Sequence, residues 1–307
     1  MDARPRLKSL DQFRGWAVFT MVLVNVLGWF KIMPETFRHH DYGFSFADSV
    51  QPFFLFVVGI GLGLSFKSYG AAFKRCAFLA VLGVIFWSAL KLLLNQKGWA
   101  SLWPLRGDAL TDIGLAGLVS LLVIKRSILT RFIFALSCAV LLQVITDLKY
   151  PFSEALGFLG WSFPLLMGMI LADCLRASKE RIPTVCLSWG LPLTIVGLIL
   201  SSHWPFSQKF MTCSYSITST GLGFLAFLAF HAVNDLWGKS LPHLSTLGKN
   251  ALLVYLLHTI LFRIVRVSDI TNRYANALVA LTVFAVIYLV CYLSSLYLEK
   301  KNKFLKI

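Results

Sequence analysis

The chain has 307 residues, of which 57% are hydrophobic and only 14% are charged, whereas soluble domains carry roughly 25% charged residues. This composition excludes an ordinary water-soluble domain, because repeated apolar runs of about 20 residues are typical of membrane-spanning helices. The formal net charge of +15 comes mainly from Lys and Arg at the ends of apolar runs, where they anchor helices, so we do not expect nucleic-acid binding.

Apolar runs follow one another along the whole chain, and each predicts a spanning helix. The sequence therefore predicts an all-α fold, a polytopic transmembrane helical bundle of about ten spanning helices, with residues 1–307 forming a single transmembrane domain. The predicted spans are 13–31, 46–66, 73–94, 109–124, 128–146, 155–175, 183–202, 214–236, 248–267 and 275–297.

The distribution of basic residues predicts the orientation of these spans. If the N-terminus is cytoplasmic, about two thirds of the Lys and Arg residues fall on the cytoplasmic side, which is the bias expected of membrane proteins. We therefore expect an integral, multi-pass protein with both termini in the cytoplasm. Many basic residues still remain on the opposite side, and some of them are candidates for contacting an anionic ligand.

Cysteine and glycine patterns in the chain predict packing rather than chemistry. The six cysteines are scattered without a CxxC pair, so we expect neither disulfides nor a metal site. The glycines between Gly59 and Gly63 lie inside an apolar run without a preceding strand. We therefore interpret them as a close helix contact and not as a dinucleotide motif.

Polar residues in the first span are candidates for function, because a polar side chain surrounded by lipid must face a partner, water or the bundle interior. Asp11 and Arg14 are spaced i, i+3 and could either pair locally or contact substrate. Asn25 lies further along the same span. It could serve as a hydrogen bond between helices or as part of a site.

The connection after the first span concentrates ionisable residues. His39, His40, Asp41 and Tyr42 are consecutive, and Asp48 opens the next apolar run. A carboxylate next to an imidazole can orient it and keep it basic, which would suit a catalytic base. The competing interpretations are a solvated loop and, for Asp48, a cap at the start of a helix.

The ninth predicted span carries two polar residues at helical spacing. Asn250 and His258 are eight residues apart, so a continuous helix would project both from nearly the same face. They are therefore predicted to face the bundle, either as structural hydrogen-bonding groups or as substrate contacts.

Several of these residues recur in order within a recognisable pattern. The sequence reads RLKSLDQFRG at 6–15, MVLVN at 21–25, FRH at 37–39 and ADSVQPFFLFVVG at 47–59, with weaker matches TCSYSITSTG at 212–221 and GKNALLVY at 248–255. This pattern resembles the heparan-α-glucosaminide N-acetyltransferase family, including bacterial relatives often described as NagX-like. The resemblance is dense over 6–66 and patchy over about 210–260.

The resemblance implies a transmembrane acyltransferase-like domain that transfers acetyl from cytoplasmic acetyl-CoA to an amino sugar or glycan on the other side of the membrane. In the family an Asn late in the first span and a His in the following loop are catalytic, which implies those roles for Asn25 and His39. His40 is an alternative to His39, because the loop length differs from that of relatives. Tyr42 stands where relatives tend to have Trp.

Acetyl transfer needs a base for the amine proton and a donor for the developing oxyanion. We predict His39 as the base, oriented by Asp41 or Asp48, and Asn25 as the donor. A transient acetyl-histidine would instead give ping-pong kinetics. The residues predicted to contact substrate are Asp11, Arg14, Tyr42, Asn250 and His258, and those predicted to hold the acetyl-CoA phosphates are Arg14, Lys74, Arg75 and Lys249.

Three other functions remain open on the sequence alone. A membrane O-acyltransferase would use the same donor with a hydroxyl acceptor on an envelope glycan. A small-molecule transporter would use the polar residues of the spans as a pathway, although no inverted repeat is evident. A structural subunit would tolerate loss of His39. For the preferred function we expect a bacterial inner-membrane location, and we also consider a homodimer.

Overall fold

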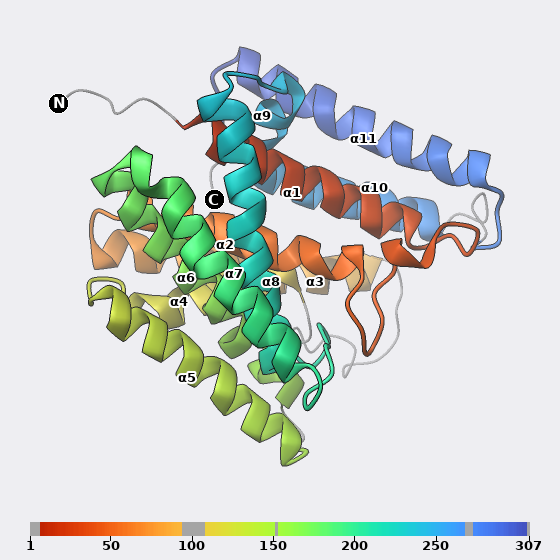
Figure 1. Ribbon diagram of the computed structural model, residues 1–307. Helices are drawn as coiled ribbons and strands as arrows, with labels where there is room; N and C mark the ends of the chain where they lie inside the picture. The colour runs from red at the N-terminus through yellow and green to blue at the C-terminus, as the bar shows by residue number, and fades with distance from the viewer. Residues whose placement is uncertain (1–6, 94–107, 151–152, 268–272, 306–307) are drawn as a thin grey trace. The chain divides into compact units, whose positions relative to one another are not determined.

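The computed structural model describes residues 7–93, 108–150, 153–267 and 273–305, and it contains no β-strand in these ranges. The all-α prediction is therefore confirmed for the described chain (Figure 1). Its helices are α1 (Lys8–Leu27), α2 (Phe46–Ser65), α3 (Tyr69–Leu93), α4 (Ala109–Leu121), α5 (Ile128–Asp147), α6 (Phe158–Ala177), α7 (Ile182–Leu200), α8 (Cys213–His231), α9 (Pro242–Lys249), α10 (Ala251–Val267) and α11 (Ala277–Lys300), with short 3-10 turns η1 (Glu35–Phe37), η3 (Ser153–Leu156) and η4 (Lys179–Arg181) and a π-turn η5 (Ala232–Leu236).

The chain is an integral membrane protein by the length and apolar character of its helices. Seven helical segments of the described chain could each cross a membrane, and the bent pair α9 and α10 would make an eighth. The predicted number of about ten is slightly too high. One reason is that α4 has only 13 residues, which is too short to cross about 30 Å of hydrocarbon.

The predicted span 248–267 is not one straight helix. The chain breaks at Asn250, whose backbone dihedrals of −122° and 35° are not helical, and α9 and α10 meet at 86°. The prediction that Asn250 and His258 share a face of one continuous helix is therefore wrong. A local break of this kind leaves no mark in the hydrophobic pattern, because the apolar residues continue through it.

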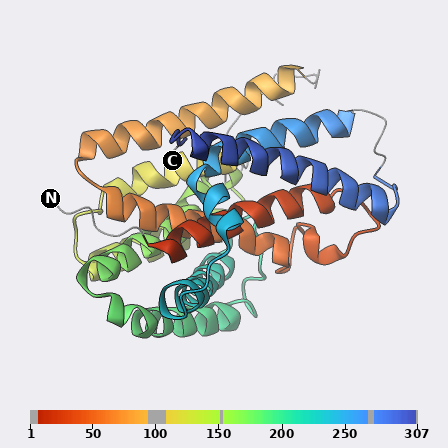
Figure 2. The ribbon, with the colours of Figure 1, turned by 90° about the horizontal axis from the view of Figure 1, so that it is seen from above.

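Two compact units divide the chain, and α2 and α8 each contribute residues to both. The first unit comprises Met1–His39, Ser45–Val50 and Ala226–Ile307. Within it α1, α10 and α11 lie side by side (Figure 2). The short helix α9 crosses α1 so closely that a Cβ on Gly15 would collide with the Leu244 backbone, and one on Gly248 would collide with the Asp11 backbone.

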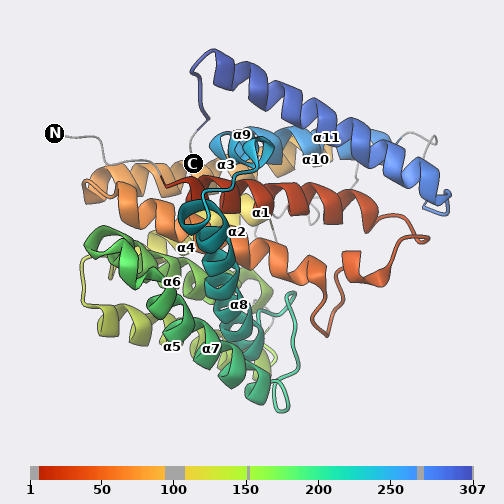
Figure 3. The same cartoon turned by 45° about the horizontal axis from the view of Figure 1, so that its top comes forward.

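The second unit comprises His40–Phe44 and Gln51–Leu225. In it α3 packs on α4, while α4, α5 and α7 each contact α6 (Figure 3). Gly59 and Gly63 of α2 pack directly against Leu165 and Ala172 of α6, with no room for a Cβ. The interpretation of these glycines as a close helix contact is confirmed.

Candidate active site

The first turn of α2 is closed by Ser45 and Asp48, which belong to the first unit. Asp48 Oδ2 accepts a hydrogen bond from the Ser45 backbone N–H at 2.8 Å. Ser45 Oγ lies 2.8 Å from the same carboxylate oxygen and 2.9 Å from the Arg38 carbonyl oxygen, two acceptors for its single hydrogen. A Ser followed three residues later by an acid is a helix-start pattern that satisfies orphan backbone groups, so Asp48 is held in place by the fold.

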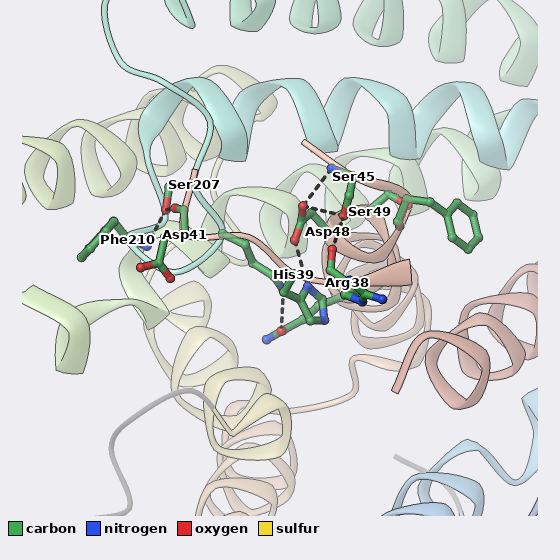
Figure 4. A network of polar contacts seen from close by, with 11 residues as sticks. Arg38, His39, Asp41, Ser45, Asp48, Ser49, Ser207 and Phe210 are labelled. Carbon is green, nitrogen blue, oxygen red and sulfur yellow. Dashed lines mark hydrogen bonds and ion pairs between the residues drawn. The ribbon is translucent and has the colours of Figure 1, made fainter. Parts of the chain in front are cut away.

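The other oxygen of Asp48 orients His39. His39 Nδ1 lies 2.8 Å from Asp48 Oδ1 (Figure 4). An ionised carboxylate can only accept, so Nδ1–H donates and the neutral imidazole keeps its lone pair on Nε2. The Asp48 side chain is 1% exposed and that of His39 is 50% exposed. A buried carboxylate thus fixes an imidazole whose ring still reaches the surface, which is the arrangement expected of a general base.

Arg38 holds the segment that carries His39 against the end of α1. Its Nη2 donates to the carbonyl oxygens of Phe30, Lys31 and Met33 at 3.2, 2.6 and 2.9 Å. A Cβ on Gly28 would collide with the Phe37 carbonyl oxygen, so the loop returns directly over the last turn of α1. The part of the loop that leads to His39 is therefore tied down by specific contacts, while most of its side chains are exposed.

The residues that follow His39 in sequence belong to the second unit. His40 is exposed and forms no hydrogen bond with the described residues. Asp41 Oδ2 accepts from Lys209 Nζ at 2.8 Å, a hydrogen bond that raises the pKa of Lys209. The Tyr42 ring lies 5.7 Å from that of Phe210. Of the two acids predicted to orient His39, the one in contact with it is Asp48.

A second imidazole of the first unit fixes Asn25. His258 Nδ1 is 2.9 Å from the Val254 carbonyl oxygen, which can only accept, so this nitrogen carries the hydrogen. His258 Nε2 is therefore an acceptor in the neutral ring, and Asn25 Nδ2 donates to it at 3.1 Å. His258 is buried, with 1% exposure, while Asn25 is exposed. The second N–H of the Asn25 amide has no hydrogen-bond partner among residues 7–93, 108–150, 153–267 and 273–305.

The other residues predicted to contact substrate have structural contacts. Asn250 is fully buried; its Nδ2 donates to the Ser295 carbonyl oxygen at 3.2 Å, and its Oδ1 accepts from the Leu305 backbone N–H at 3.3 Å. These bonds tie the α9–α10 break to α11 and to the C-terminal segment. Asp11 is buried on the first turn of α1, where its backbone contacts Gly248.

The four basic residues predicted to hold acetyl-CoA divide between the units. In the first unit, Lys249 pairs with Glu299, and its helix α9 packs across the part of α1 that carries Arg14. In the second unit, Arg75 Nη1 donates to Ser65 Oγ at 2.9 Å, and Lys74 is exposed. Arg14 and Lys249 are thus the pair that shares one unit with His39 and Asn25.

Arg38 contributes to this site although the sequence analysis did not single it out, and so does Ser45. Its signal was present, because Ser45 and Asp48 have the spacing of a capping pair. The contact between Asn25 and His258 had no such signal, since 233 residues separate them.

Comparisons with known proteins show which proteins this chain resembles. A family profile described as "Heparan-alpha-glucosaminide N-acetyltransferase, catalytic" matches residues 6–203. The human heparan-alpha-glucosaminide N-acetyltransferase is 37% identical over 93 residues, which cover 29% of this chain and 13% of the human protein. The mouse protein of the same name is 36% identical over 92 residues, again 29% of this chain and 13% of the relative. The similar stretch is therefore a small part of these longer proteins.

Proposed function

Because this chain belongs to the heparan-α-glucosaminide N-acetyltransferase family, we propose that it is a membrane acetyltransferase that moves acetyl from acetyl-CoA to the amino group of a sugar or glycan. The observation that carries the proposal is the hydrogen bond between His39 and Asp48. It joins a half-exposed imidazole to a buried carboxylate in the loop that follows the first helix.

His39 acts as the general base. With Nδ1–H directed to Asp48, Nε2 accepts the proton of the attacking amine while the amine nitrogen bonds to the acetyl carbon. The carbon–sulfur bond then breaks, and coenzyme A leaves as the thiol after taking the proton back from the imidazolium. Asp48 stabilises the imidazolium between these two steps, as a buried carboxylate does for other catalytic histidines.

Asn25 stabilises the oxyanion that forms on the acetyl carbonyl. Its first amide hydrogen is directed to His258 Nε2, so the second can donate to the developing charge. A preformed donor costs no reorganisation at the moment of reaction, which is why such groups contribute strongly to catalysis. His258 positions Asn25 and does not itself touch the reacting atoms.

The donor enters from the cytoplasmic side in this proposal, with the acceptor on the side of the His39 loop. In this proposal the phosphates of acetyl-CoA are held by Arg14 and Lys249, the two predicted phosphate ligands that share the first unit with His39. The proposal also places both termini in the cytoplasm of a bacterial cell, with the protein in the inner membrane.

Transfer of labelled acetyl tests this function directly. The purified full chain in detergent is given acetyl-CoA labelled in the acetyl group together with glucosamine-containing acceptors, and labelled N-acetyl product is measured. Wild type should form product, His39→Ala should lose on the order of 10²- to 10⁴-fold in rate, and the matched control His40→Ala should stay close to wild type. Equal rates for all three proteins would refute the site, and absence of acetyl-CoA binding would refute the enzyme.

A further inference from the structure

Two loops of the second unit are joined into one surface by hydrogen bonds between them. The Gly43 backbone N–H donates to the Phe206 carbonyl oxygen at 2.7 Å. Ser207 Oγ donates to the Asp41 carbonyl oxygen at 2.6 Å (Figure 4). Because backbone groups of both loops take part, side chains from the two loops are held together. These loops, residues 41–44 and 205–212, are called the two-loop surface below.

An exposed aromatic side chain lies on the two-loop surface. Tyr42 is 61% exposed, and its ring lies 5.7 Å from the Phe210 ring of the second loop. The ion pair between Asp41 and Lys209, at 2.8 Å, joins the same two loops. An aromatic ring offers a broad apolar face with a polar edge. The ring of a sugar has the matching form, because its C–H groups make an apolar face that is edged by hydroxyls.

A chain of two amides leads from the second loop to a buried carboxylate. Gln208 Nε2 donates to Gln51 Oε1 at 3.1 Å, and Gln51 Nε2 donates to Asp112 Oδ2 at 3.3 Å. Asp112 is 9% exposed, and the Trp161 indole, which can only donate, also hydrogen-bonds to it. Since the carboxylate accepts, Gln51 turns its oxygen towards Gln208, and Gln208 must answer with an N–H. The carboxylate thus sets the orientation of both amides.

Gln208 ends this chain with hydrogen-bonding capacity to spare. One of its N–H groups is used on Gln51, while its second N–H and Oε1 form no hydrogen bond within the described ranges. Its side chain is only partly buried. A fixed amide offers a donor and an acceptor in one plane, and two neighbouring hydroxyls, each able to donate and accept, match both. A group that is oriented before binding loses less entropy when a ligand arrives.

We propose that the two-loop surface binds the ring of the acceptor sugar, with the Gln208 amide on two neighbouring hydroxyls and the Tyr42 ring against the apolar face of the sugar. Gln51 and Asp112 are positioning residues that hold Gln208 in one orientation. The surface begins two residues after His39 in the chain. That the acceptor is a sugar rests on the proposed function, and the amide chain adds the residues that recognise its hydroxyls.

Saturation-transfer difference NMR on the purified full chain in detergent tests the proposal without acetyl-CoA. It measures Kd for D-glucosamine and for cyclohexylamine, an amine on a six-membered ring without hydroxyls. Wild type should bind glucosamine more tightly. Gln208→Leu should weaken glucosamine binding about tenfold, because hydrogen bonds are lost, and leave cyclohexylamine binding unchanged. Gln51→Leu removes the anchor of Gln208 and should weaken glucosamine binding less. Tyr42→Leu should weaken the binding of both ligands.

Gln143→Leu is the matched control. Gln143 is another amide of the second unit that donates to a carboxylate, Asp147 Oδ1, at 2.8 Å, and its replacement should leave glucosamine binding like wild type. Absence of glucosamine binding to wild type, or an equal loss of both ligands in Gln208→Leu, would overturn the proposal. Labelled acetyl product with unchanged glucosamine affinity in Gln208→Leu would overturn it and sustain acetyl transfer, whereas the expected sugar binding without product would do the reverse. Thermal unfolding verifies that each variant is folded.

Discussion

Two histidines of the first unit make contrasting contacts. His39 lies in a loop, is half-exposed, and directs Nδ1 to the buried carboxylate of Asp48. His258 lies inside α10, is buried, and directs Nδ1 to a backbone carbonyl. A carboxylate stabilises a protonated ring and leaves Nε2 for substrate, whereas in His258 Nε2 is already occupied by Asn25. The contrast supports the proposed roles of His39 in proton transfer and of His258 in positioning Asn25.

Loss of the Asp48 carboxylate should have the largest effect on kcat. Asp48→Asn keeps the shape of the side chain but can donate as well as accept, so His39 loses its fixed tautomer and the charge that stabilises its imidazolium. We expect kcat to fall on the order of 10⁴-fold, as for the equivalent change in other catalytic histidine–carboxylate pairs, with acetyl-CoA binding unchanged. Steady-state kinetics and a separate binding measurement would distinguish these quantities.

Asp108→Asn is the matched control for that variant. Asp108 is also buried and also closes the first turn of a helix, since it accepts from the Thr111 backbone N–H. The control should lower thermal stability in a comparable way but leave kcat close to wild type. A comparable fall of kcat in both variants would mean that Asp48 serves only to cap its helix.

Removal of the Asn25 amide donor should have the second largest effect on kcat. Asn25→Asp has nearly the same shape but replaces the amide N–H groups by an oxygen, which repels a developing oxyanion. Loss of one oxyanion donor costs about 10²- to 10³-fold in kcat. The same kinetic assay measures the loss. A wild-type kcat in this variant would remove Asn25 from the catalytic site.

Substitution of His258, which positions Asn25 in our proposal, should have a smaller effect on kcat. His258→Leu leaves Asn25 without its anchor, and a displaced catalytic group can cost up to about 10²-fold. His258→Gln retains an acceptor and should recover part of the rate. Because His258 acts only through Asn25, adding His258→Leu to Asn25→Asp should lower kcat little further.

The matched control for this substitution is His231→Leu. His231 is another buried histidine of the first unit, with Nδ1 bound to Asp235 at 2.9 Å. Its replacement should leave kcat unchanged once folding is verified. Additive losses in the His258 and Asn25 double variant would show that His258 has a role of its own.

Local signals account for what the sequence could predict. The apolar runs predicted the helical class correctly. The family resemblance proposed Asn25 and His39 as catalytic, with Asp41 or Asp48 as the acid that orients His39, and of these two acids Asp48 is the one hydrogen-bonded to His39. The break at Asn250 was not predictable, because apolar residues continue through it and only the backbone changes. The partner of Asn25 was not predictable either, since a contact across 233 residues depends on how α1 and α10 pack and not on local pattern.

The smallest effect on kcat is expected at Ser45, whose hydroxyl donates to the Asp48 carboxylate. Ser45→Ala removes one hydrogen-bond donor to Asp48 but keeps the backbone N–H that holds the same oxygen. Loss of a hydrogen bond to a charged group costs about 1.5 to 3 kcal/mol of stability, so thermal unfolding should shift to lower temperature while kcat changes only a few-fold. Ser127→Ala is the matched control, because Ser127 caps α5 through the Thr130 N–H. If Ser45→Ala lowered kcat as much as Asp48→Asn, the hydroxyl itself would be what orients the carboxylate towards His39.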